Sequence, residues 1–142
     1  MKNITIQERI HPDYEACKSL CEKIIKLDSN IRFASIINDR GRKVRSASRK
    51  GVKFLVNKKD CEMLFMELAL RTRMRREFDS QMGQVNFSLS HRKKVIVISI
   101  PFGNDLLYVS AEPELDLYMI PFKIIDILKE ENMYCNPSNS SY

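Results

Sequence analysis

The stretch LFMELALRTRMRREFD, residues 64–79, decides how this chain folds. Its apolar residues recur at steps of three and four, which is the period of an α-helix. Plotted at about 100° per residue, this stretch and the residues just before it form a helix with two apolar sectors. One sector holds Cys61, Leu64, Phe65 and Leu68, and the other holds Met63, Met66, Leu70 and Met74, with Phe78 at its border. A helix that lies on a sheet needs one apolar face, so the second sector needs a second apolar partner.

Polar residues separate the two sectors. Glu67 and Asp60 lie between them on one side. On the other side we expect a polar sector made of Glu62, Ala69, Arg73 and Arg76. The second apolar sector could pack on the last helix of the same chain or on the same helix of a second copy. Its methionine content favours an adaptable contact surface. The arginines near the helix end complement the helix dipole, so we interpret them as rim and capping residues.

Further elements are predicted on both sides of this helix. The helix itself should run from Lys58 to Met82, with Asn57 as its cap and Gly83 just past its end. We expect another helix over 12–27, strands over 31–38, 43–48, 84–91, 94–101 and 105–112, and a last helix from 118 or 120 to 131. The strand over 43–48 should be an exposed edge, and the strand over 94–101 should be buried on both faces. The order α-β-β-α-β-β-β-α predicts an α+β fold, a five-stranded antiparallel sheet flanked by helices.

Composition predicts one compact domain over residues 1–131 and a disordered C-terminal tail over 132–142. The 142 residues are 44% hydrophobic, enough for one core. No window approaches the roughly 18 consecutive apolar residues of a membrane span, and the N-terminal stretch lacks a signal-peptide core, so we expect a cytoplasmic protein. The scattered cysteines indicate reduced thiols. Cys17 and Cys21 are expected to be buried small hydrophobes, and Cys135 is the thiol expected to react.

Positive charge is concentrated in one window. The net charge is +6, yet residues 40–59 contain nine lysines and arginines and no acidic residue. The predicted basic surface comprises Arg40, Arg42, Lys43, Arg45, Arg49, Lys50 and Lys53, with Lys58 and Lys59 further along the window. Such a surface could bind phosphates, but lysines and arginines on an edge strand also prevent edge-to-edge aggregation. An acidic protein partner is favoured over nucleic acid.

Residues that carry catalysis are not grouped in this sequence. His11 and His91 have no cysteine or carboxylate at metal-ligand spacing, and the four glycines fall at turns or helix ends instead of forming a phosphate loop. We therefore expect no metal, no cofactor and no enzymatic activity. Ser99, within VIVISIP, is the one candidate for an unexplained buried polar group, which would favour a ligand pocket.

Two resemblances extend this reading. The predicted element order resembles the roadblock, or dynein light chain seven, group of profilin-like domains. The segments RFASIINDRGRKV and LFMELALRTRMRREFD and the strands that follow are similar to an uncharacterised domain family of ammonia-oxidising archaea, over residues 17–130. The roadblock resemblance implies a non-enzymatic scaffold or regulator, which in some relatives acts on small GTPases or motility systems.

We expect this module to homodimerise through the third strand and the second apolar sector, formed by Met63, Met66, Leu70, Met74 and Phe78. Two other functions stay open. One is a small-ligand sensor with a pocket between the sheet and a helix, and the other is polyanion binding through residues 40–59.

Overall fold

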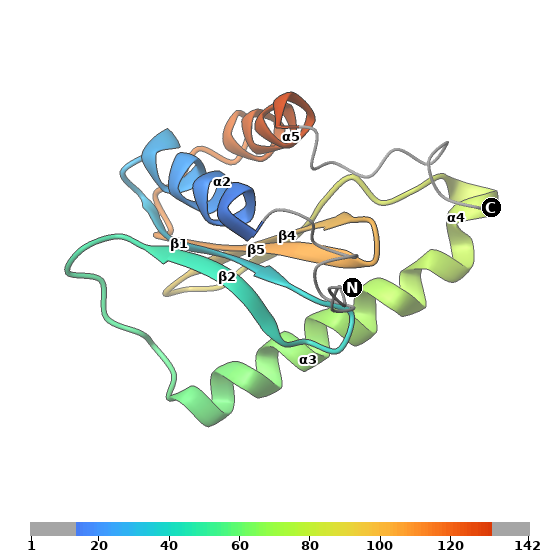
Figure 1. Cartoon of the computed structure of the whole chain (residues 1–142), viewed down its shortest axis with the longest axis horizontal. Coiled ribbons are helices and arrows are strands. Elements are labelled where there is room, and N and C mark those ends of the chain that lie inside the picture. Colours follow the sequence, from blue (N-terminus) through green and yellow to red (C-terminus); the bar gives the residue numbers. More distant parts are fainter. Residues whose placement is uncertain (1–13, 132–142) are drawn as a thin grey trace, which may run out of the picture.

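A five-stranded antiparallel sheet organises the chain (Figure 1). The structure, a computed structural model, describes residues 14–131. The helices are α2 (Tyr14–Leu27), α3 (Lys58–Arg75), α4 (Asp79–Met82) and α5 (Ile120–Glu130), with a single 3-10 turn, η1 (Arg76–Phe78), between α3 and α4. The strands are β1 (Ile31–Ile37), β2 (Lys43–Ser48), β3 (Ser88–His91), β4 (Ile96–Phe102) and β5 (Asp105–Ala111). This order confirms the predicted α+β fold.

The strands lie in the order β2-β1-β5-β4-β3, so β2 and β3 are the two edges. Ile37 at the end of β1 pairs with Leu106 near the start of β5. The turns of the β1–β2 and β4–β5 hairpins therefore lie at the same end of the sheet. Helices α2 and α5 cover one face, and α3 lies on the other (Figure 1).

The larger core lies between the sheet and the pair α2 and α5. Leu20 and Ile24 of α2 meet Ile98 of β4, Leu107 of β5 and Ile124 of α5, all fully buried. Cys17 and Cys21 belong to this core, which confirms their prediction as buried small hydrophobes. Desolvation by burial raises the pKa of the Cys21 thiol to about 12, so this group stays protonated at neutral pH.

The core on the α3 face is thinner. It consists of Phe33, Ile37, Phe65, Ala69, Leu106 and Tyr108. Only Phe65 and Ala69 of α3 are buried. The prediction that Ala69 lies in a polar sector is wrong, because this residue is 3% exposed. Ala69 follows Phe65 by four residues, about 40° around the helix, and its methyl group lets the helix approach the strands closely.

Helix boundaries agree with the sequence pattern, with one interruption. The Asn57 side chain accepts a hydrogen bond from the backbone N–H of Asp60 at 2.8 Å, which confirms the predicted cap. The helix predicted over 58–82 is divided by η1 before it reaches Gly83. At α5, the uncertain start is resolved at Ile120, which places Pro121 in the first turn, where its missing N–H costs no hydrogen bond.

The third predicted strand is wrong in its first half. Residues 84–87 are not a strand, and β3 begins at Ser88. Phe87 instead packs edge-on against the Phe122 ring of α5, with ring centroids 5.4 Å apart. The predictions for Pro12, for the tail over 132–142 and for the reactive Cys135 lie outside the described residues.

Candidate functional site

Five apolar side chains of the α3 region are more than half exposed to solvent. We call them the apolar stripe: Met63, Met66, Leu70, Met74 and Phe78, each between 51% and 61% exposed. Helix α5 lies across the sheet from α3, so it cannot be their partner. The structure thereby removes one of the two packings left open by the sequence. A group of exposed large apolar side chains is typical of a protein interaction site.

The turn of the β1–β2 hairpin holds α3 at its centre. Gly41 has φ +80° and is buried against α3. A Cβ at this position would lie 2.6 Å from Met66 Cα and 2.8 Å from Met66 N, closer than any side chain can approach. Glycine is therefore required both by the backbone conformation and by direct contact with the helix. The sequence indicated the turn but not this contact.

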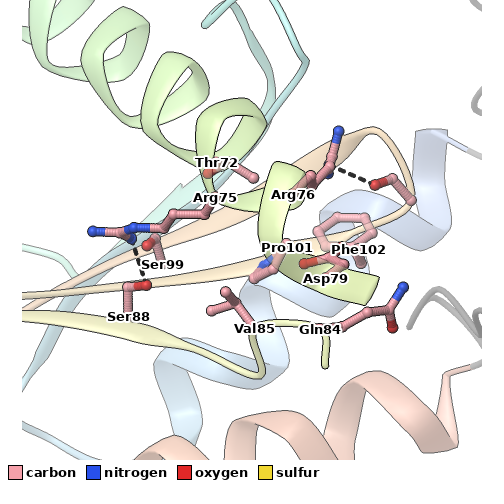
Figure 2. Close-up of a pocket in the computed structure, with 11 residues that line it drawn as sticks. Thr72, Arg75, Arg76, Asp79, Gln84, Val85, Ser88, Ser99, Pro101 and Phe102 are labelled. Carbon is pink, nitrogen blue, oxygen red and sulfur yellow. Dashed lines mark hydrogen bonds between the residues drawn. The ribbon is translucent and has the colours of Figure 1, made fainter. Parts of the chain in front are cut away.

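Two arginines anchor the C-terminal end of α3 and the start of η1 (Figure 2). The Arg75 guanidinium donates to Ser88 Oγ of β3 at 2.6 Å. The Arg76 guanidinium donates to the carbonyl of Gly103, in the β4–β5 turn, at 2.7 Å. These bonds attach α3 to β3 and η1 to the β4–β5 turn. The arginines of this segment thus act partly as structural anchors, beyond the rim and capping role expected for them.

A small cavity with a mixed polar and apolar lining lies next to these arginines (Figure 2). Its volume is about 50 Å³, and it is lined by residues of α3, η1, α4 and β4 together with the segment 84–88. Ser99, the polar candidate from the sequence, is 5% exposed and lies here. This space suits a few water molecules, not an organic ligand.

A larger cavity lies between α3 and the opposite end of the sheet. We call it the α3–sheet cavity. Its volume is about 460 Å³, within the range typical of small-molecule sites. Most of its wall is apolar, from Phe33, Phe54, Leu55, Val56, Leu64, Leu68, Val95, Val97 and Tyr108. Four cations also line it, namely Arg32, Arg92, Lys93 and Lys94.

Arg32 is the buried charge of this cavity. The residue is 9% exposed, and its Nη1 donates to Glu112 Oε1 at 2.9 Å. Its Nη2 donates to the carbonyl of Lys53, which ties the loop before α3 to β1. Nε is buried and has no hydrogen-bond partner among the described residues. Sequence reasoning missed Arg32, although a cation inside the β-branched run IRFASII was a usable signal.

Tyr108 lies on the cavity floor between two phenylalanines. Its ring stacks on Phe33 with centroids 5.6 Å apart, and Phe65 meets it edge-on at 5.0 Å. Desolvation by burial, with the neighbouring Cys61 as a smaller cause, raises the pKa of Tyr108 to about 12. The phenol therefore stays neutral at physiological pH and offers a hydrogen-bonding group in an apolar wall.

The basic window is not one uniform surface. Arg40, Arg42, Lys43, Lys50 and Lys53 are exposed, and Arg45 is half-buried on β2. Arg49 differs, because its Nε donates to the carbonyl of Ile31 at 2.8 Å and its Nη2 donates to the carbonyls of Ile25 and Asp28. Its guanidinium thus joins the end of α2 to β1. That internal role weakens the argument for a phosphate-binding surface.

Nucleic-acid binding through the basic window is expected to be weak, independent of base sequence and lost near physiological salt. Phe54 is the single aromatic residue of this window, so the window lacks the series of aromatic rings on which successive bases of a single strand stack. Fluorescence titration of labelled single-stranded DNA at about 0.05 and 0.15 M salt tests this expectation.

The contrary result is sub-micromolar binding at the higher salt that is lost in an Arg42→Glu, Arg45→Glu double variant. The matched control is Lys18→Glu, Lys123→Glu, which changes the net charge equally on α2 and α5. If both double variants bind alike, the effect is one of overall charge and not of a site.

Comparison with known proteins places the chain in a family. It belongs to DUF6659, a family of unknown function, whose model matches residues 1–137. No curated protein matches its sequence. Within residues 14–131, every helix is too short or too polar to traverse a lipid bilayer.

Solved structures with a similar fold include roadblock domains and profilins. The Roadblock/LC7 domain from Streptomyces avermitilis is similar with a TM-score of 0.63 and 11% identity, over 81% of this chain and 93% of that one. The gliding protein MglB from Thermus thermophilus has a TM-score of 0.65 and 10% sequence identity, over 83% of this chain and 89% of MglB. A structure of MglB with tetrameric arrangement has a TM-score of 0.61 and 11% sequence identity, over 83% of this chain and 91% of that one. The roadblock-like fold inferred from the element order is thus confirmed.

Proposed function

We propose that this chain is a non-catalytic interaction module that forms a homodimer and regulates a protein partner. The observation that carries the proposal is the exposed apolar stripe on α3. Four of its side chains lie on one face of α3, the longest helix, and Phe78 follows on η1. Each of the five remains more than half exposed in the single chain. Covering exposed apolar side chains with a partner removes them from water, which stabilises the complex.

A second copy is the simplest partner for the stripe. A two-fold axis brings a patch onto its own twin, so a surface that is apolar throughout is automatically complementary to itself. The methionines can adjust their side chains to one another without precise shape matching. The tetrameric arrangement named for one MglB structure shows that a protein of this fold can assemble with itself.

An edge strand offers a second contact for the same dimer. β3 pairs with β4 on one side only, and Ser90 and His91 on it are exposed. Arg75 connects this strand to the end of α3. A partner that reaches the stripe near Met74 is therefore close to an edge whose backbone groups are available for pairing.

The anchors of α3 support a preformed interface. Gly41 contacts the helix at Met66, and Arg75 and Arg76 attach its end to β3 and to the β4–β5 turn. A helix fixed at these points loses little further freedom on association, which favours affinity. For the regulated partner we propose an acidic protein, with a small GTPase as one candidate, facing the exposed cations of the 40–53 region.

Light scattering of the wild-type protein tests the dimer. We expect twice the chain mass of 16.6 kDa at concentrations of about 10 µM and above, and reversible dissociation on dilution. A single-chain mass at about 100 µM would contradict the proposal, since a functional interface should act well below that concentration.

The α3–sheet cavity supports a second candidate function, a small-ligand sensor. Its 460 Å³, its apolar wall and its buried Arg32 are the features expected of a ligand site. Ser99, which the sequence suggested for this role, lies in the smaller cavity instead.

A further inference from the structure

We propose that the α3–sheet cavity binds an aromatic molecule that carries one negatively charged group. The inference rests on the second candidate function and gives its ligand a chemical class. The cavity and the stripe use different faces of α3, so the ligand site and the stripe contact can be tested separately, although Ser90 of the β3 edge also lines the cavity.

The apolar part of the cavity defines the body of the ligand. Leu64 and Leu68 of α3 form one wall, and Val95 and Val97 before and on β4 form another. These four side chains are all partly exposed, so a ligand would remove them from water. The resulting gain scales with the apolar area covered and supplies the bulk of the affinity.

Three aromatic rings favour a planar ligand. The Phe33 ring lies 5.3 Å from the Phe54 ring and 5.6 Å from the Tyr108 ring, centroid to centroid. The three rings therefore form one continuous group at the cavity. Phe54 is 63% exposed although it comes from an apolar run, FLV, in the loop before α3. A flat aromatic body can lie against these faces with offset or edge contacts, which stabilise aromatic pairs beyond simple burial.

The charges around the cavity select an anion. Arg92, Lys93 and Lys94 lie together on the β3–β4 turn, and no carboxylate among residues 14–131 forms an ion pair with them. Glu67 is the carboxylate among the described lining residues, and it pairs with Arg71 at 3.5 Å. The cavity therefore combines an apolar interior with a positive rim, to which a single anionic group is complementary.

Arg32 adds an internal reason to expect an anion. A buried guanidinium normally uses all its donors, because a buried donor without a partner loses its hydrogen bonds to water and gains none in return. Here Nη1 and Nη2 have partners while Nε has none among the described residues. A small adjustment of the side chain toward an anionic oxygen in the cavity would satisfy that donor.

Fluorescent probes of matched shape test the proposal. Anilinonaphthalene sulfonate has the aromatic body and the anionic group, and N-phenylnaphthylamine has the body without the charge. We expect saturable binding of the sulfonate with one site per chain, at least about tenfold tighter than that of the neutral probe. Equal affinity for the two probes would overturn the choice of an anion.

Variants then locate the bound probe. Arg92→Ala, Lys94→Ala should weaken sulfonate binding about tenfold and leave the neutral probe unchanged, because both side chains are exposed and act through charge. Val97→Phe fills the cavity and should abolish binding of both probes. Leu70→Asp, in the stripe, is the control and should leave both affinities unchanged. Loss of binding in the stripe variant instead of the cavity variants would overturn the site.

A thiol inside the cavity gives a measurement that does not depend on fluorescence. Cys61 lines the cavity and is partly exposed, whereas Cys17 and Cys21 are buried. In a Cys135→Ser variant, bound sulfonate should slow the alkylation of Cys61 at least about fivefold at saturation, since the site is then more than about 80% occupied. Unchanged alkylation at saturation would show that the probe lies elsewhere. Absence of probe binding with an intact dimer would reject the ligand site and leave the interaction module standing.

Discussion

A Leu70→Asp variant should be a folded monomer at concentrations where the wild-type protein is a dimer. Leu70 lies at the centre of the apolar stripe, is 51% exposed and makes no contribution to either core cluster. The substitution therefore leaves the interior of the single chain unchanged. In a two-fold dimer it places a carboxylate on both sides of the contact, because each stripe meets its twin.

The expected loss of affinity is large. An unpaired carboxylate removed from water costs several kcal/mol, and two of them face each other here. Since each 1.4 kcal/mol changes the dissociation constant about tenfold, we expect an increase of at least about a hundredfold. Light scattering measures the mass, and circular dichroism shows whether the helices are retained.

Met119→Asp is the matched control for this variant. Met119 is 50% exposed, almost the same as Leu70, but it lies at the N-cap of α5 on the opposite face of the sheet. Aspartate is favoured at an N-cap, so the fold should tolerate it. A monomer in both variants would indicate a nonspecific effect of added charge. An unfolded Leu70→Asp protein would show that the stripe supports the single chain, which contradicts the assignment to a second copy.

The periodicity of α3 contained most of the information about the candidate interface. A helix that rests on a sheet through one face cannot hide a second apolar face, whatever the details of packing. Spacing along the sequence is therefore enough to separate the five stripe residues from Leu64 and Leu68. The structure adds that α5 lies on the other side of the sheet, which spacing along the chain cannot show.

Other features depend on contacts between distant segments, and sequence patterns do not encode these. Ala69 was assigned to the polar sector because alanine is compatible with either environment, and its burial follows from how closely α3 approaches β5. In the sequence, Gly41 looks like an ordinary turn glycine. The structure shows that glycine is needed here because a Cβ would collide with Met66. Residues 84–87 alternate like a strand, but the contact of Phe87 with Phe122 competes with strand pairing.

The cavity could not have been located from the sequence for a related reason. Its wall combines the loop at 54–56, the first half of α3, the β3–β4 turn and the floor of β5, which are separate in the chain. Arg32 is visible in the sequence as a charged residue within an apolar strand. Its pairing with Glu112 follows from the register that sets Ile31 opposite Ala111.

The two faces of the sheet differ in how much apolar core they contain and in the candidate binding surfaces they carry. The α2 and α5 face contains the larger cluster of buried apolar side chains, whereas the α3 face contains a cluster of six buried apolar residues, the stripe and the larger cavity. The attachment of α3 therefore rests on few contacts. Among them, Phe65 is the largest α3 side chain in the core, 6% exposed and 5.0 Å from the Tyr108 ring, centroid to centroid.

Phe65→Ala should lower the free energy of unfolding by about 3–5 kcal/mol, through lost burial and the cavity left against Tyr108. The comparison is Phe78→Ala, which removes the same atoms from a side chain that is 58% exposed and should change stability by less than about 0.5 kcal/mol. Both substitutions belong in the Leu70→Asp background, because unfolding of a dimer would add the free energy of dissociation to every value. Urea titration followed by circular dichroism gives the free energies, and equal slopes confirm that the same surface unfolds. A loss below about 1 kcal/mol for Phe65→Ala, or equal losses for the two variants, would mean that α3 is held by Gly41 and the arginine anchors and not by its buried face.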